Sequence, residues 1–169
     1  MSRYLGLIGQ NAKKASLDKV NSKNKNKILK RYAFLLGKEK KSIFKANQKD
    51  IQFALGKGLK NNLIERLTID EKKLIDIKNS IDKIAKLKNP VDVTLKKWRR
   101  PNGLTISRVS IPIGVIGVIY ESRPNVTSDI ASLCFKSGNA VILKGGSEAI
   151  NTNKILAKLF RKSLKENRV

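Results

Sequence analysis

The sequence has no histidine and one cysteine, Cys134, among its 169 residues. Without histidine a Cys–His catalytic pair cannot form, and a single cysteine excludes an internal disulfide. The same shortage excludes a zinc site built from the usual nitrogen and sulfur ligands, and the scattered acidic residues show no calcium-loop spacing. Because Cys134 stands between two apolar residues in a helical pattern, we expect a small core residue rather than a nucleophile.

Long hydrophobic runs are absent as well. No apolar run is long enough to cross a bilayer, and the first residues show no secretory signal. The composition, 40% hydrophobic and 30% charged, is typical of a soluble globular domain with a sizeable core. We therefore expect a cytoplasmic protein that holds no metal and does not associate with membranes.

Negative charge is scarce: 13 acidic residues stand against 37 lysines and arginines, which gives a net charge of +24. One interpretation is a basic nucleic-acid- or anion-binding module without catalysis, because dense positive charge gains affinity from counterion release. The other is drift in composition, since lysine, asparagine and isoleucine are over-used along the whole chain. Only Trp98-Arg99-Arg100 combines basic and aromatic residues as nucleic-acid-binding domains do. The even spread of charge favours drift.

Residues 1–90 show the apolar spacing of helices, for example over residues 28–36, where apolar side chains recur every three or four positions. The glycines of residues 56–58 mark a turn. Thr68 followed three residues later by Glu71 is a capping-box signature. It predicts that a further helix begins at Thr68.

From residue 91 the pattern changes to strands. Asn102-Gly103 between two strand-like runs predicts a β-hairpin over 91–110. Residues 114–120 are apolar on both faces, which predicts a strand buried in a parallel sheet. The rest of the chain alternates helix, buried strand and helix over 126–137, 139–143 and 147–166.

This order predicts an α/β fold with a helical N-terminal region, a β-hairpin and the first βαβα part of a Rossmann-like doubly wound sheet. Two strands alone leave large apolar faces and an unpaired edge. We therefore expect the sheet to be truncated.

One candidate site is the turn formed by Lys144, Gly145, Gly146, Ser147 and Glu148, between a strand and a helix. Free N–H groups and the helix dipole favour a phosphate or ribose there. Lys144 can pair with a 2′-phosphate, and Glu148 can accept a hydrogen bond from a ribose hydroxyl. Neither a P-loop nor a Gly-x-Gly-x-x-Gly fingerprint is present. A tight turn that merely needs two glycines is an equally good interpretation.

A second candidate site is the loop over 121–127, at the carboxyl end of a parallel strand, where α/β sheets bind ligands. Arg123 offers a guanidinium fork for a carboxylate or phosphate, and Asn125 offers an amide N–H for a developing oxyanion. An ordinary strand-to-helix loop with helix-capping residues is the alternative.

Both candidate sites lie in stretches that resemble a known family. The stretches 109–127 and 132–149 look like γ-glutamyl phosphate reductase, a branch of the aldehyde dehydrogenase superfamily, and the run Tyr120-Glu-Ser-Arg-Pro-Asn-Val-Thr127 is highly specific to that enzyme. Asn47-Gln-Lys-Asp50 and Gly58-Leu-Lys-Asn-Asn-Leu-Ile-Glu-Arg-Leu67 resemble it more loosely. The resemblance covers the whole chain and is strongest from about residue 108 to 153.

The resemblance implies NADPH-dependent reduction of L-glutamyl 5-phosphate to L-glutamate 5-semialdehyde and phosphate, in proline biosynthesis. In that family a cysteine thiolate attacks the acyl phosphate, and the thioester then takes hydride from NADPH. The family also implies a functional link to glutamate 5-kinase and a homo-oligomer in the intact parent enzyme.

The family's site residues match positions of this sequence. Asn125 is the best match for the oxyanion-supporting asparagine, with Arg123 or Ser122 as alternative counterparts. Arg123 is expected to bind substrate. Lys144 and Glu148 match the residues that hold the adenosine ribose, and residues 145–147 then contact the same end of the cofactor.

The sequence also departs from the family. The family enzyme is more than twice as long, and its catalytic cysteine stands in a Thr-Cys-Asn context that is absent here. We therefore expect an N-terminal fragment that is inactive alone. It divides into a helical part of the cofactor domain (1–90), a hairpin of the oligomerisation region (91–110) and an incomplete NADP-binding unit (111–169).

Overall fold

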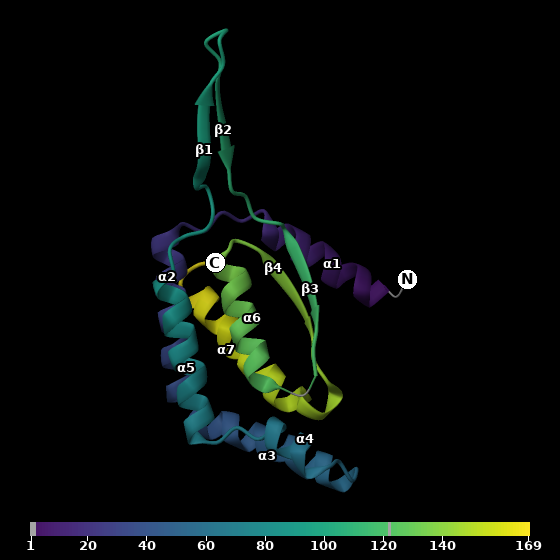
Figure 1. Cartoon of the computed structure of the whole chain (residues 1–169). Helices are drawn as coiled ribbons and strands as arrows, with labels where there is room; N and C mark the ends of the chain where they lie inside the picture. The colour runs from purple at the N-terminus through teal and green to yellow at the C-terminus, as the bar shows by residue number, and fades with distance from the viewer. Residues whose placement is uncertain (1–2, 122) are drawn as a thin grey trace.

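The computed structural model describes residues 3–121 and 123–169 and shows a mixed α/β chain that is mostly helical, with two small sheets (Figure 1). The elements are α1 (Arg3–Ser16), α2 (Ser22–Lys38), α3 (Lys40–Gly56), α4 (Asn61–Leu67), α5 (Glu71–Lys86), β1 (Thr94–Arg99), β2 (Thr105–Val109), β3 (Val115–Ile119), α6 (Pro124–Lys136), β4 (Ala140–Lys144), η1 (Ser147–Ala149) and α7 (Ile150–Glu166). The predicted order of helices and strands is confirmed.

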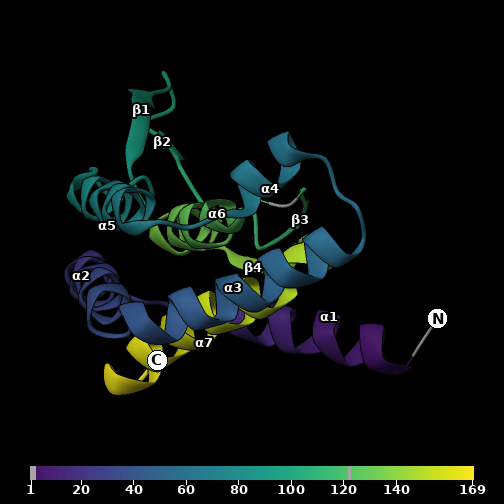
Figure 2. The same cartoon turned by 90° about the horizontal axis from the view of Figure 1, so that it is seen from below.

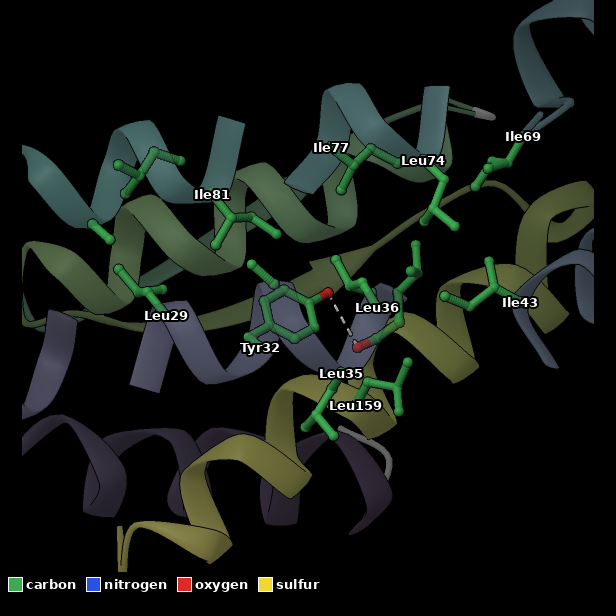
Figure 3. Packing of buried hydrophobic residues seen from close by; sticks show 14 residues of the cluster. Leu29, Tyr32, Leu35, Leu36, Ile43, Ile69, Leu74, Ile77, Ile81 and Leu159 are labelled. Atoms are coloured by element: carbon green, nitrogen blue, oxygen red, sulfur yellow. Dashed lines mark hydrogen bonds between the residues drawn. The ribbon is translucent and has the colours of Figure 1, made fainter. Parts of the chain in front are cut away.

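The core is a bundle of helices. Helix α2 packs against α5 and α7, α6 packs against α5 and α7, and α3 lies along α7 (Figure 2). Tyr32 is fully buried at the centre and donates a hydrogen bond to the carbonyl of Leu156 at 3.3 Å (Figure 3). Its ring also packs edge-on against Phe160. The apolar face predicted over residues 28–36 is the face that α2 buries.

A buried carboxylate joins α3 to the beginning of α7. Asp50 is 1% exposed, and its oxygens accept hydrogen bonds from the backbone N–H groups of Asn151 and Thr152 at 3.0 and 2.7 Å. The side chains of the same two residues donate to it as well, both at 2.7 Å. A negative charge at a helix N-terminus satisfies free donors and complements the helix dipole. Asp50 therefore caps a helix 101 positions along the chain.

The predicted capping box at Thr68 is wrong. The residue that caps α5 is Asp70, whose carboxylate accepts from the backbone N–H of Lys73 at 2.6 Å. Thr68 instead ends α4, and its hydroxyl donates to the carbonyl of Ile64 at 2.8 Å. Since Asp70 stands next to the first helical residue, its carboxylate reaches the free N–H groups of α5 directly.

The hairpin predicted over 91–110 is confirmed. Strands β1 and β2 pair antiparallel and extend away from the helices (Figure 1). Gly103 adopts a positive φ of 86° in the turn, a conformation that glycine takes without strain. All residues of β1 are exposed, so the hairpin makes little contact with the core.

Strands β3 and β4 pair in parallel, as predicted, but the prediction that they are buried is wrong. Side chains of β3 alternate between exposed and half-buried, and those of β4 are mostly half-buried. Ile119 is 87% exposed, and Ile111 and Ile113 just before β3 are 78% and 83% exposed. A parallel sheet is buried where helices pack on its faces and further strands pair with its edges, and a sheet of two strands has few such neighbours. Along the described part of the chain, no helix has the length and apolar character needed to cross a membrane.

Candidate functional site

The two candidate sites meet the sheet at the same edge. Ile119, the last residue of β3, pairs with Lys144, the last residue of β4, and the backbone N–H of Tyr120 donates to the carbonyl of Lys144 at 3.1 Å. The loop after β3 and the turn after β4 therefore leave the sheet side by side. In parallel α/β sheets this carboxyl edge is where ligands bind.

A chain of hydrogen bonds holds the edge against the helices. The Thr127 hydroxyl donates to the Asn153 side-chain carbonyl at 2.8 Å, so the Tyr120 hydroxyl must donate to Thr127, at 2.6 Å. Burial raises the pKa of Tyr120, and the hydrogen bond to Thr127 acts in the opposite direction. The phenol is therefore a neutral donor at physiological pH. It ties the end of β3 to α6 and α7.

Gly145 is required by this packing. A Cβ atom at this position would lie 2.5 Å from Asn153 Nδ2 and 2.9 Å from the Tyr120 hydroxyl oxygen. Real side chains do not tolerate such distances, so the absence of a side chain lets the turn approach Tyr120 closely. The tight-turn interpretation therefore accounts for Gly145 without a ligand.

The polar groups of the turn are grouped at the start of η1, which leads into α7. Lys144 is exposed, with its ammonium 3.3 Å from the carbonyl of Gly145. The Ser147 hydroxyl donates to Glu148 Oε2 at 3.2 Å, and Gly146 is the N-terminal cap of η1. A cation, a hydroxyl and a carboxylate within five residues can hold a phosphorylated ribose.

Arg123 and Asn125 belong to the other candidate site, the loop after β3, and lie at the N-terminal end of α6. Both are exposed, and both line a cleft of about 480 Å³ between α6 and helices α4 and α5. Among the described residues that line this cleft, none comes from the turn 144–148. The two candidate sites are thus separate surfaces of one sheet edge. Ser122, the alternative oxyanion residue, lies outside the described residues.

Cys134 is buried, as its place in the helical pattern predicts, and is 7% exposed. Burial raises the pKa of its thiol, which opposes formation of the thiolate that a nucleophile needs. Within residues 3–121 and 123–169 no three His, Cys, Asp or Glu side chains gather as metal ligands would.

Several residues around the site escaped the sequence interpretation. Thr127 and Asn153 hold Tyr120, and the far wall of the cleft comes from Arg66, Lys73 and the other lining residues of α4 and α5. These residues come together only through tertiary packing.

Comparison with known proteins gives one consistent result. No family model matches the sequence. The chain is 46% identical to the γ-glutamyl phosphate reductase of Clostridium tetani over 169 residues, which cover 99% of this chain and 40% of that protein. It is 50% identical to the reductase of a Hydrogenobaculum species, covering 99% of this chain and 38% of that protein.

Solved structures agree. The crystal structure of the Thermotoga maritima γ-glutamyl phosphate reductase matches with a TM-score of 0.90 and 39% identity, covering 93% of this chain and 38% of that one. The Saccharomyces cerevisiae reductase matches with a TM-score of 0.89 and 34% identity, covering 95% of this chain and 41% of that one. The chain is therefore a homologue of γ-glutamyl phosphate reductase that spans about 40% of the length of the reductases it matches.

Proposed function

We propose that this chain provides the NADPH-binding and oxyanion-stabilising part of an enzyme that reduces L-glutamyl 5-phosphate to L-glutamate 5-semialdehyde and phosphate, in proline biosynthesis. The observation that carries the proposal is the 46% identity to the Clostridium tetani reductase over 99% of the chain. The two loops that leave one carboxyl edge of the β3–β4 sheet support it, because the chemistry needs a cofactor and an acyl group at adjacent places.

In this proposal the turn after β4 holds the cofactor. The Lys144 ammonium pairs with the 2′-phosphate, and the Glu148 carboxylate accepts a hydrogen bond from a ribose hydroxyl. Gly145, Gly146 and Ser147 let the backbone approach that end of the molecule. Bound NADPH supplies a hydride to the acyl carbon.

The loop after β3 acts on the substrate. The Asn125 amide donates to the oxyanion that develops on the acyl oxygen, and the Arg123 guanidinium binds an anionic group of the substrate. The hydrogen-bonded Tyr120–Thr127–Asn153 chain holds this loop against α6 and α7. It therefore keeps Asn125 in place while charge develops.

We propose in addition that the β3–β4 sheet is part of a larger Rossmann-like sheet. Strands β3 and β4, joined through α6, are the first two strands of a Rossmann-like sheet. Residues 1–90 form the helical part of its cofactor domain, and residues 111–169 form an incomplete NADP-binding unit. The exposed apolar residues Ile111, Ile113 and Ile119 support it, since the additional helices and strands around such a sheet bury residues of this kind. The hairpin over 91–110 belongs to the oligomer contact.

The nucleophile must come from outside this chain, because Cys134 is a buried core residue with a raised thiol pKa. We expect the 169-residue chain to show no phosphate-dependent reduction of NADP⁺ with glutamate 5-semialdehyde. Turnover above that of a protein-free blank would contradict this assignment.

Titration of the chain with NADPH tests the cofactor site. We expect Lys144→Ala to weaken NADPH binding about tenfold or more and NADH binding little, because only NADPH carries the 2′-phosphate. Lys154→Ala, an exposed lysine of α7, is the matched control and leaves both affinities unchanged. Equal NADPH affinity of the wild type and Lys144→Ala would refute the site.

The basic-module alternative makes a different prediction. The exposed hairpin carries Trp98, Arg99 and Arg100, with the Lys96 ammonium 5.9 Å from the Trp98 ring centroid. If this surface bound nucleic acid, affinity for a short DNA would fall with salt on a log–log slope of several units. Lys144→Ala would then leave the dominant binding activity unchanged.

A further inference from the structure

We infer that the cleft between α6 and helices α4–α5 recognises the α-amino acid end of the substrate, with Arg66 binding the α-carboxylate and Asp76 the α-ammonium. The inference rests on the proposed function and deepens it. It assigns a substrate-recognition role to residues of α4 and α5, whereas the substrate and cofactor residues of the proposed function all follow β3 or β4.

The cleft carries charges of both signs. Its volume of about 480 Å³ lies within the range of small-molecule sites. Three of its lining side chains are cationic and two are anionic: Arg66, Lys73, Arg123, Asp76 and Asp129. An α-amino acid presents one carboxylate and one ammonium, so its charges match a cleft with charges of both signs better than those of a simple anion do.

Two of the five charged groups are already engaged in holding the walls. The Lys73 ammonium donates to the carbonyls of Glu65 and Thr68 at 2.6 and 2.9 Å, which fixes the end of α4 against α5. The Ser80 hydroxyl donates to Asp129 Oδ1 at 2.8 Å, which joins α5 to α6. The cleft therefore has a fixed frame, and its shape does not depend on a ligand.

The remaining three groups are available. Arg66, Asp76 and Arg123 are exposed, and among the described residues none of the three makes a salt bridge or a side-chain hydrogen bond. Unpaired charges of both signs on one cleft are complementary to a zwitterion, since each gains a partner on binding.

The arrangement also orients the substrate. Asn125 and Arg123 stand on the α6 wall, where the proposed function places the reacting acyl phosphate, and Arg66 and Asp76 stand on the opposite wall. A glutamyl group that spans the cleft thus has its α-carbon at α4–α5 and its γ-carbonyl at Asn125. Such fixed positioning raises the rate of the reaction at the far end.

Nuclear magnetic resonance of the ¹⁵N-labelled chain tests the inference, with L-glutamate and glutarate as probes. Glutarate has the same two carboxylates and no ammonium. We expect L-glutamate to shift the amides of residues that line the cleft and to bind about tenfold more tightly than glutarate. Equal shifts with both probes, or no response of the cleft to L-glutamate, would overturn the inference without any variant.

Two variants test which side chain binds the α-ammonium and which binds the α-carboxylate. Asp76→Asn is expected to lower L-glutamate affinity to that of glutarate and to leave glutarate binding unchanged, while Arg66→Gln weakens both. Asp82→Asn, on the same helix but outside the lining, and Arg161→Gln, on α7, are the matched controls. Unchanged L-glutamate affinity in Asp76→Asn and Arg66→Gln would overturn the assignment.

The same sample separates this inference from the proposed function. NADPH binding that depends on Lys144, without any response of the cleft to L-glutamate, would overturn the inference and leave the proposed function standing. A cleft response to L-glutamate without NADPH binding would refute the cofactor proposal instead.

Discussion

The helical bundle and the β3–β4 sheet follow the same rules of patterning and reach different degrees of burial. In the bundle, Ile81 and Leu156 are fully buried, whereas Ile119 at the end of β3 is 87% exposed. A helix satisfies its own backbone hydrogen bonds and needs only one covered face, but a strand also needs neighbours at both edges. The stability of this chain therefore resides in its helices, and the residues of the candidate sites lie on the less covered part.

The largest expected difference between the two regions is in the cost of replacing a large apolar side chain by alanine. Leu156→Ala in the bundle is expected to lower the free energy of unfolding by about 2–5 kcal/mol, and Ile119→Ala in β3 by less than about 0.5 kcal/mol. Urea unfolding followed by circular dichroism measures both. Similar losses for the two variants would show that the sheet is covered in solution and would break the comparison.

Removal of the hydrogen bonds that connect α3 to α7 is expected to give the next largest loss of unfolding free energy. Asp50→Ala removes an acceptor of four hydrogen bonds at the beginning of α7, and we expect a loss of about 2–3 kcal/mol. Asp70→Ala removes the single cap of α5 and is expected to cost about 1 kcal/mol. An Asp50→Ala loss no greater than that of Asp70→Ala would contradict the role of Asp50 as the buried anchor of α7.

The smallest expected effect is the dependence of stability on pH, which tests how deeply the helical bundle buries Tyr32. Burial raises the pKa of Tyr32 above its ordinary value of about 10. Below that pH the phenol is protonated in both states, so its contribution to stability is complete. Above it, only the unfolded chain ionises, and stability falls as pH rises.

Tyr32→Phe is therefore expected to lower stability by about 1 kcal/mol at neutral pH and to reduce the further loss above pH about 10. A smaller alkaline loss persists, because burial also raises the pKa values of Tyr120 and Cys134. Urea unfolding at neutral and alkaline pH provides the comparison. An unchanged alkaline loss in Tyr32→Phe would contradict the buried position of the phenol.

Local patterns predicted the helices, the hairpin and the parallel order of β3 and β4, because each depends on spacing within a few residues. They missed partners that are distant in sequence. Asp50 accepts hydrogen bonds from Thr152, and nothing in the local pattern indicated that Lys25 and Lys136 are only 5% and 2% exposed. Lys136 donates to the carbonyl of Ala85 at 2.9 Å, and burial lowers the pKa of both lysines.

The candidate sites show the same limit. The residues of the turn 144–148 and of the loop 121–127 were chosen as candidates from their local chemistry and from the resemblance to γ-glutamyl phosphate reductase. The cleft that contains Arg123 and Asn125 has its opposite wall in α4 and α5, more than forty positions earlier in the chain. Only the packing of α5 against α6 brings the two walls together.

Transplantation tests the central claim most directly. The segment of the Clostridium tetani reductase that matches this chain is replaced by the chain itself, and phosphate-dependent reduction of NADP⁺ by glutamate 5-semialdehyde is measured. The account predicts an active enzyme whose turnover falls about 10²–10³-fold on Asn125→Ala and whose affinity for NADPH falls on Lys144→Ala. A folded but inactive chimera, or an active one that tolerates both substitutions, would contradict it.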